Sequence, residues 1–130
     1  MRFKSIITVS VMALLLIASS SSIAALKVGD KAPNFSLQDQ NNITHTLSDY
    51  EGQWVVLYFY PKDDTPGCTT QACDFRDAVK RIIVSKSVVF GLSLDSVASH
   101  KLFAEKYNLP FSLLADETGE VSKLYDSLRK

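Results

Sequence analysis

The sequence after residue 25 predicts an α/β domain, because strand-like and helix-like apolar patterns alternate along it. Residues 54–60 are a continuous apolar run, typical of a central strand covered on both faces, and residues 88–94 are expected to form another buried strand. Stretches with apolar residues three and four positions apart follow each run, as in amphipathic helices. This alternation favours right-handed crossovers and a largely parallel sheet covered by helices.

The other predicted strands are short. Residues 35–37 and 43–47 alternate apolar and polar side chains on either side of the turn-forming stretch 39–42. This pattern predicts a hairpin near the start of the domain, with one buried face. A last strand is expected at residues 111–114, before a turn at 116–119.

Three helices are expected, over residues 69–84, 97–107 and 120–128. Their core-facing side chains are predicted to include Ala72, Phe75, Val79, Ile82, Ile83, Leu102, Phe103 and Tyr107. Four polar residues are predicted to lie in solvated loops or at the packed surface, namely Asp63, Asp64, His45 and His100.

Residues 1–24 have the pattern of a secretory signal peptide. A basic start with Arg2 and Lys4 precedes the apolar run 6–18, and small residues near Ala24 offer a cleavage site. The apolar run is shorter than the roughly 20 residues of a membrane-spanning helix. We therefore expect an exported protein, periplasmic or otherwise extracytoplasmic, without stable membrane insertion after cleavage.

Residues 25–130 are enough for one domain with one core and too few for two. The chain carries 14 basic and 14 acidic residues, and the signal segment removes only Arg2 and Lys4, so the charge stays near neutral. No basic block interleaved with aromatic residues is present, which argues against a nucleic-acid partner. The sequence also lacks a phosphate-binding glycine loop, and we expect no bound cofactor.

Cys68 and Cys73 are the two cysteines of the chain, and several roles are open to them. In an exported protein they could form a structural disulfide. A zinc site with His45 and His100 is disfavoured, because the histidines are scattered singly, and we expect no metal. A thiol–disulfide oxidoreductase would place its cysteines two positions apart.

Cys68 has the context of a reactive thiol. It follows the predicted strand 54–60 and begins a helix, where unpaired backbone N–H groups and the helix dipole favour thiolate over thiol. The hydroxyl of Thr65 can turn toward the sulfur or toward a bound oxygen, and Pro61 and Pro66 stiffen the loop between strand and helix. A thiolate in this setting is suited to attack on an O–O bond, which would make Cys68 a sulfenic acid.

At this stretch the sequence resembles the peroxiredoxins, most closely their bacterioferritin comigratory protein, or peroxiredoxin Q, branch. The family pattern of a proline, a threonine and the peroxidatic cysteine is matched by Pro61, Thr65 and Cys68. The branch has a second cysteine five positions further on, which is Cys73 here. The resemblance runs from residues 29–37 to 103–107, nearly the whole mature chain.

The resemblance implies a thioredoxin-like fold, with a mixed sheet flanked by helices and a hairpin at its start. It implies reduction of hydrogen peroxide and organic hydroperoxides at Cys68, with Cys73 as the resolving cysteine and an intramolecular disulfide as the product. Re-reduction by a thioredoxin-like protein is implied as well, and we expect a monomer. On a regular helix, Cα atoms five residues apart lie about 8.6 Å apart, beyond the roughly 7 Å limit of a disulfide. A bridge therefore requires partial unwinding, which suits a redox switch better than a permanent link.

In one respect the chain departs from the family. Members continue past the position of Lys130 and bring an arginine close to the peroxidatic sulfur, and neither Arg129 nor Arg76 matches that arginine by position. On this resemblance we expect a C-terminally incomplete chain, either a fragment of a longer product or a natural truncation, with weak or absent turnover. The alternatives are a remnant that senses oxidant or binds a partner through Cys68, and a thiol–disulfide oxidoreductase.

Overall fold

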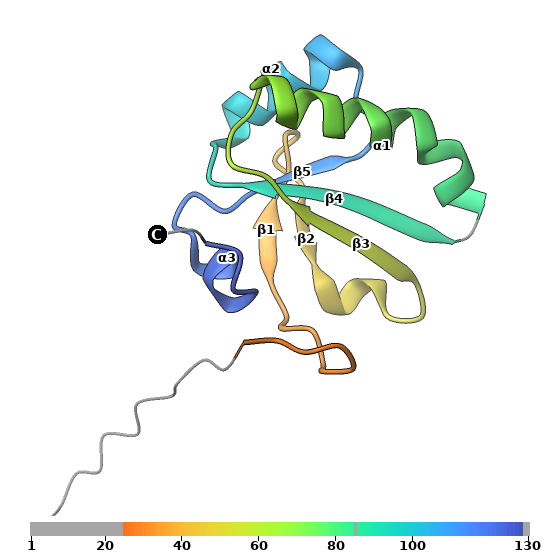
Figure 1. The fold of residues 1–130 in the computed structure, drawn as a ribbon, viewed down its shortest axis with the longest axis vertical. Helices are drawn as coiled ribbons and strands as arrows, with labels where there is room; N and C mark the ends of the chain where they lie inside the picture. The colour runs from red at the N-terminus through yellow and green to blue at the C-terminus, as the bar shows by residue number, and fades with distance from the viewer. Residues whose placement is uncertain (1–24, 85, 129–130) are drawn as a thin grey trace, which may run out of the picture.

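A three-stranded sheet and a separate hairpin form the framework of the protein in the computed structural model (Figure 1), which describes residues 25–84 and 86–128. The predicted signal peptide at residues 1–24 lies outside the described residues. The larger sheet is parallel throughout, with the strand order β3-β4-β5. The predicted α/β class is confirmed, because α1 and α2 connect these parallel strands.

The parallel sheet is formed by β3 (Trp54–Phe59), β4 (Ser87–Ser93) and β5 (Ser112–Ala115). Two helices link these strands in sequence, α1 (Pro66–Val84) and α2 (Val97–Tyr107). Both lie over one face of the sheet, while the hairpin and α3 lie on the other face (Figure 1). The carboxyl ends of β3 and β4 therefore meet the amino-terminal ends of α1 and α2, which is where reactive groups gather in such sheets.

The hairpin pairs β1 (Ser36–Gln38) with β2 (Thr44–Thr46) in antiparallel register. Its turn is held by Asp39, whose Oδ1 accepts hydrogen bonds from two backbone N–H groups at 2.8 and 3.0 Å. An isolated antiparallel bridge between Asp39 and Leu114 joins the hairpin to β5, so strand pairing in the fold is mixed, as predicted. A short 3-10 helix, η1 (Leu47–Tyr50), follows β2 and was not predicted from the pattern.

The prediction that residues 54–60 form a central strand is wrong within the described residues. β4 is central and β3 has a neighbour on one side only. Accordingly the side chains of β3 are mostly half-exposed or exposed, and Trp54 is 77% exposed, whereas the last five residues of β4 are all buried. Both runs are rich in apolar residues, and the order of the two strands in the sheet depends on their pairing, which an apolar run does not encode.

Helix boundaries differ from prediction at two ends. α1 begins at Pro66, three residues before the expected start, because proline is well suited to the first helical position, where its missing N–H is no loss. The last helix, α3 (Glu120–Leu124), is shorter than expected, and Asp126 has the left-handed φ of 52°, which is incompatible with a continuing helix. None of the described helices combines the length and apolar character needed to cross a membrane.

The buried face of α2 is not the one predicted. Leu102 is 71% exposed, whereas His100 and Phe103 are 0% and 2% exposed. The buried stripe runs through His100, Phe103 and Ala104, which are three and four positions apart and so share one helix face. The prediction of His100 at the surface is therefore wrong, and so is the inward placement of Leu102, because a polar residue was assumed to face outward.

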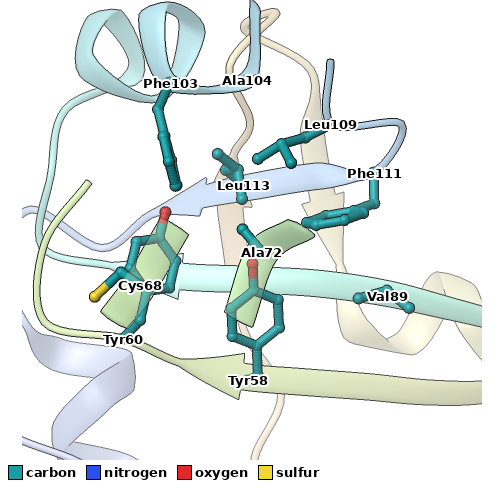
Figure 2. Packing of buried hydrophobic residues seen from close by; sticks show 10 residues of the cluster. All are labelled: Tyr58, Tyr60, Cys68, Ala72, Val89, Phe103, Ala104, Leu109, Phe111 and Leu113. Carbon is teal, nitrogen blue, oxygen red and sulfur yellow. The ribbon is translucent and has the colours of Figure 1, made fainter. Parts of the chain in front are cut away.

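Two apolar clusters fill the two faces of the sheet. The cluster beneath α1 and α2 (Figure 2) consists of Tyr58, Tyr60, Cys68, Ala72, Val89, Phe103, Ala104, Leu109, Phe111 and Leu113. The cluster on the hairpin face consists of Phe35, Phe90, Leu92, Leu114 and Val121. Leu113 and Leu114 enter different clusters because successive strand residues point to opposite faces.

Candidate active site around Cys68

Cys68 is the third residue of α1, close to the carboxyl end of β3. The first N–H groups of a helix have no partner within it, and together with the helix dipole they stabilise negative charge at that end. The first turn is well formed, since the Thr69 N–H donates to the Thr65 carbonyl at 2.8 Å. Cys68 is 7% exposed and packs in the cluster shown in Figure 2, so its sulfur is shielded from bulk water.

Thr65 and Pro61, which were predicted to belong to the site, lie in the short loop between β3 and α1. The Thr65 hydroxyl donates to the Lys62 carbonyl at 3.0 Å, which closes the loop on itself. Its oxygen lone pairs remain able to accept a hydrogen bond, and the predicted contact with substrate oxygen stays a prediction. Pro61 is exposed and contributes to a cavity of about 350 Å³, which also involves Phe59, Leu94 and Leu128.

Cys73 lies on the same helix and is half-buried, and both cysteines are free thiols. α1 runs without interruption through both positions. Their Cα atoms are thus separated by about 8.6 Å on ideal helix geometry. The structure consequently represents the reduced form, and a bridge between the two sulfurs requires the start of α1 to unwind.

Asp63 is buried, so the prediction that it lies in a solvated loop is wrong. It is 8% exposed rather than solvated. Its carboxylate accepts hydrogen bonds from the Tyr60 hydroxyl at 2.7 Å and the Ser99 hydroxyl at 2.7 Å, and from His100 Nδ1 at 2.8 Å. Its own N–H donates to Asp95 Oδ2 at 2.9 Å. The loop that leads to Cys68 is therefore fastened to the start of α2 and to the segment after β4.

The electrostatics of this network are set by competition between burial and hydrogen bonding. Burial by itself would raise the pKa of Asp63, but hydrogen bonds from His100, Tyr60 and Ser99 outweigh it and hold the pKa below the ordinary value of 3.8. Burial raises the pKa of Tyr60, and its bond to the Asp63 carboxylate raises that pKa further. Tyr60 therefore stays a neutral donor to an ionised Asp63 over the physiological range.

His100 is surrounded by acceptors on both sides of its ring. Nδ1 faces the Asp63 carboxylate, and Nε2 lies 3.1 Å from the Leu114 carbonyl oxygen. Both ring nitrogens thus lie within hydrogen-bond distance of oxygen atoms. A buried imidazole bonded to a buried carboxylate lies behind the loop, and the helical spacing of His100 with Phe103 could have indicated that His100 is buried.

Asp64 is exposed as predicted, and it points away from the buried network. Its carboxylate accepts from Lys106 Nζ and from the Tyr107 hydroxyl, each at 2.7 Å. The φ of Asp64 is 55°, in the left-handed region. The carboxylates of Asp63 and Asp64 therefore point to opposite ends of α2. Further along α1, Arg76 donates through one terminal guanidinium nitrogen to the Tyr107 carbonyl at 3.0 Å.

Tyr58 adds an unusual feature to the apolar cluster. Its hydroxyl is buried and has no hydrogen-bond partner among the described residues. The ring lies against Gly91 of β4, where a Cβ atom would come within 2.7 Å of the Tyr58 oxygen. Gly91 is therefore required for the close approach of this ring, which in turn forms part of the wall around Cys68.

A second polar cluster joins the hairpin to β5. His45 Nε2 lies 2.9 Å from Asp39 Oδ2, and the Ser112 hydroxyl donates to the same carboxylate oxygen at 2.9 Å. Ser112 and Asp39 thus both contact Nε2 of His45, while Nδ1 of His45 is bonded to the Tyr50 hydroxyl. This arrangement cannot relay a proton as a catalytic triad does. The described residues include no group of three His, Cys, Asp or Glu side chains that could hold a metal ion.

Comparison with known proteins agrees with this geometry. Residues 28–130 match the AhpC/TSA family. The chain belongs to that family. It is 52% identical over 108 residues to the chloroplastic peroxiredoxin Q of Triticum aestivum, covering 82% of this chain and 50% of that protein. It is 48% identical over 101 residues to the peroxiredoxin Bcp of Bacillus subtilis, covering 78% of this chain and 64% of the relative.

The solved structures support the same assignment. The Xanthomonas campestris bacterioferritin comigratory protein superposes with a TM-score of 0.72 at 34% identity, covering 73% of this chain and 60% of the other. The thioredoxin-like fold of the peroxiredoxins is thereby confirmed for this AhpC/TSA chain. The chain spans about half the length of the wheat peroxiredoxin and about two thirds of the Bacillus one.

Proposed function

We propose that this chain carries a thiol-dependent peroxidase site in which Cys68 is the peroxidatic cysteine. The observation that carries the proposal is the place of Cys68, buried in the first turn of α1 directly behind the Pro61–Thr65 loop. Free backbone N–H groups at a helix start stabilise a thiolate, and Cys68 is only 7% exposed to water. Membership of the AhpC/TSA family supports the same chemistry.

The proposed reaction has two steps on the protein. The Cys68 thiolate attacks one peroxide oxygen, the O–O bond breaks, and the other oxygen leaves as water or an alcohol after taking up a proton. Cys68 becomes a sulfenic acid. The Cys73 thiol then attacks the Cys68 sulfur, water leaves, and an intramolecular disulfide forms. A dithiol protein reduces this disulfide and restores both thiols.

Substrate and reductant are proposed by class. We propose hydrogen peroxide and organic hydroperoxides as substrates, and a thioredoxin-like protein as reductant. Alkyl peroxide reduction activity is named for the Xanthomonas relative, which supports the organic substrates here. Thioredoxin-like reductants suit an intramolecular disulfide, because exchange with a dithiol regenerates both cysteines without a further partner.

A peroxide-consumption assay with a thioredoxin-like reductant tests the proposal. The unsubstituted chain should show weak turnover, Cys68→Ser should show none, and Cys73→Ser should react with one equivalent of peroxide and then stop. Cys68 that is oxidised once but never turned over in the unsubstituted chain would favour an oxidant sensor. Cys68→Ser with unchanged turnover would overturn the assignment of Cys68.

We also propose that the protein is exported and monomeric, as the first 24 residues and the single domain suggest. The reductant would then act outside the cytoplasm. Mass spectrometry of the protein from its native host decides the first point, since a cytosolic species that retains Met1 would contradict export. Light scattering on the purified reduced protein decides the second.

A further inference from the structure

Tyr107, the last residue of α2, binds both ends of the segment that contains the two cysteines. Its hydroxyl donates to Asp64 Oδ1 at 2.7 Å, just before α1 begins. Its backbone carbonyl accepts from Arg76 at 3.0 Å, three positions after Cys73. Residues 65–75 therefore lie between two contacts made by one residue, 31 and 43 positions further along the chain.

Tyr107 itself is held in place by the core. Its ring packs edge-on against Phe103, with centroids 5.4 Å apart, and Phe103 is 2% exposed. Asn108 then ends α2 with a left-handed φ of 52°. The residue that contacts both ends of the cysteine segment is consequently anchored to α2 and not to α1, so it can stay in position while α1 changes.

The two steps of the proposed reaction make opposite demands on residues 65–75. Attack on peroxide needs the intact first turn, since this turn provides the free N–H groups and shields Cys68. Disulfide formation needs the same turn to open, because about 8.6 Å between Cα atoms exceeds the roughly 7 Å limit of a disulfide. A contact that holds the helical form thus favours the first step and opposes the second.

We propose that Tyr107 is a positioning residue that holds residues 65–75 in the helical form and so sets the balance between peroxide attack at Cys68 and closure of the disulfide with Cys73. The inference rests on the proposed function of the two cysteines. The hydroxyl contact to Asp64 restrains the start of the segment, and the carbonyl contact from Arg76 restrains its end. Neither contact touches the reacting atoms.

Neighbouring ion pairs act beside this restraint. Lys106 also bonds Asp64, with 58% and 44% of the two side chains exposed, and Arg76 pairs with Asp77, which is 69% exposed. Exposed ion pairs of this kind contribute little, because water competes for both charges. The Tyr107 hydroxyl bonds the same exposed carboxylate as Lys106, so Tyr107→Phe removes one of two contacts there and its effect should be small but measurable.

Hydrogen exchange of the reduced protein tests the restraint without any peroxide. In Tyr107→Phe, amides of residues 67–73 should exchange about three- to tenfold faster, as expected for the loss of one solvent-exposed hydrogen bond. Tyr50→Phe is the matched control, since it removes a hydroxyl bonded to His45 in the distant hairpin cluster. Its effect on residues 67–73 should be nil, and unchanged exchange in Tyr107→Phe would overturn the proposal.

Single-turnover kinetics test the balance between the two steps. Tyr107→Phe should slow the reaction of Cys68 with peroxide and speed the subsequent closure of the disulfide, two effects of opposite sign that general loss of stability would not produce. Slowing of both steps, or of neither, contradicts the proposal. If Cys68 proves unreactive toward peroxide in the unsubstituted chain, the proposed function fails, and the exchange measurement still decides whether Tyr107 holds the segment.

Discussion

His100 Nδ1 lies 2.8 Å from Asp63 Oδ2, and both side chains are buried behind the loop that leads to Cys68. The imidazole is fully enclosed and the carboxylate nearly so, with 0% and 5% of the side chains exposed. A buried carboxylate bonded to a buried imidazole is stable only when the remaining polar atoms are also bonded. Here Tyr60, Ser99 and the Leu114 carbonyl complete the set.

Replacement of His100 by leucine should lower the free energy of unfolding by about 3 kcal/mol, because it leaves the buried Asp63 carboxylate without its imidazole donor. Urea denaturation followed by circular dichroism measures this change. Lys101→Leu is the control on the same helix, since Lys101 is 54% exposed and pairs with Glu105, which is also exposed. That variant should stay within about 0.5 kcal/mol of the unsubstituted protein. Equal losses in both variants would show that the buried pair has no special weight.

Acid should destabilise the protein partly through Asp63. The folded-state pKa of Asp63 is depressed below the ordinary value of 3.8, so its contribution is fully present above that value. The contribution is lost as the pH falls from there through the lower folded pKa. Asp63→Asn should be less stable at neutral pH, and its stability should fall less steeply below about pH 4. Parallel pH profiles for the two proteins, from thermal melts between pH 7 and pH 2, would contradict this account.

Gly91→Ala should destabilise the domain by about 2 kcal/mol, as overpacked cores do. The added Cβ would lie 2.7 Å from the Tyr58 oxygen and 2.8 Å from Leu113 Cδ2, and both neighbours are buried. Gly67→Ala is the control, because no heavy atom lies within 4 Å of a Cβ there and the position is helical. It should leave thermal stability unchanged or slightly raised. A tolerated Gly91→Ala would mean that the Tyr58 ring moves freely.

Thr65→Val should slow peroxide reduction by roughly ten- to hundredfold while leaving the fold intact, since the loop before Cys68 loses its closing hydrogen bond to Lys62. Thr65→Ser keeps the hydroxyl and should retain most of the activity. Steady-state rates at several peroxide concentrations give the comparison, and circular dichroism checks the fold. If valine and serine have equal rates, the hydroxyl has no part in the reaction.

The sequence by itself determined the order of the main elements and the place of the reactive thiol. Apolar runs and helical spacing are local properties, so β4 and α2 were predicted within one residue of their observed bounds. The position of Cys68 at a helix start also follows from local pattern, namely a strand, a proline-rich loop and an amphipathic stretch. Resemblance to the peroxiredoxins added the fold type, which the comparisons confirm.

Tertiary structure alone decided which partners the polar residues meet. Asp63 and His100 are 37 positions apart, and nothing in the local pattern indicates that their side chains form a hydrogen bond. The edge position of β3 likewise depends on pairing between distant segments, and so does the double contact of Tyr107 with residues before and after the cysteines. The spacing of apolar residues along a short stretch indicates whether that stretch is a helix or a strand. Whether a polar group can be buried depends instead on hydrogen bonds that distant parts of the chain supply.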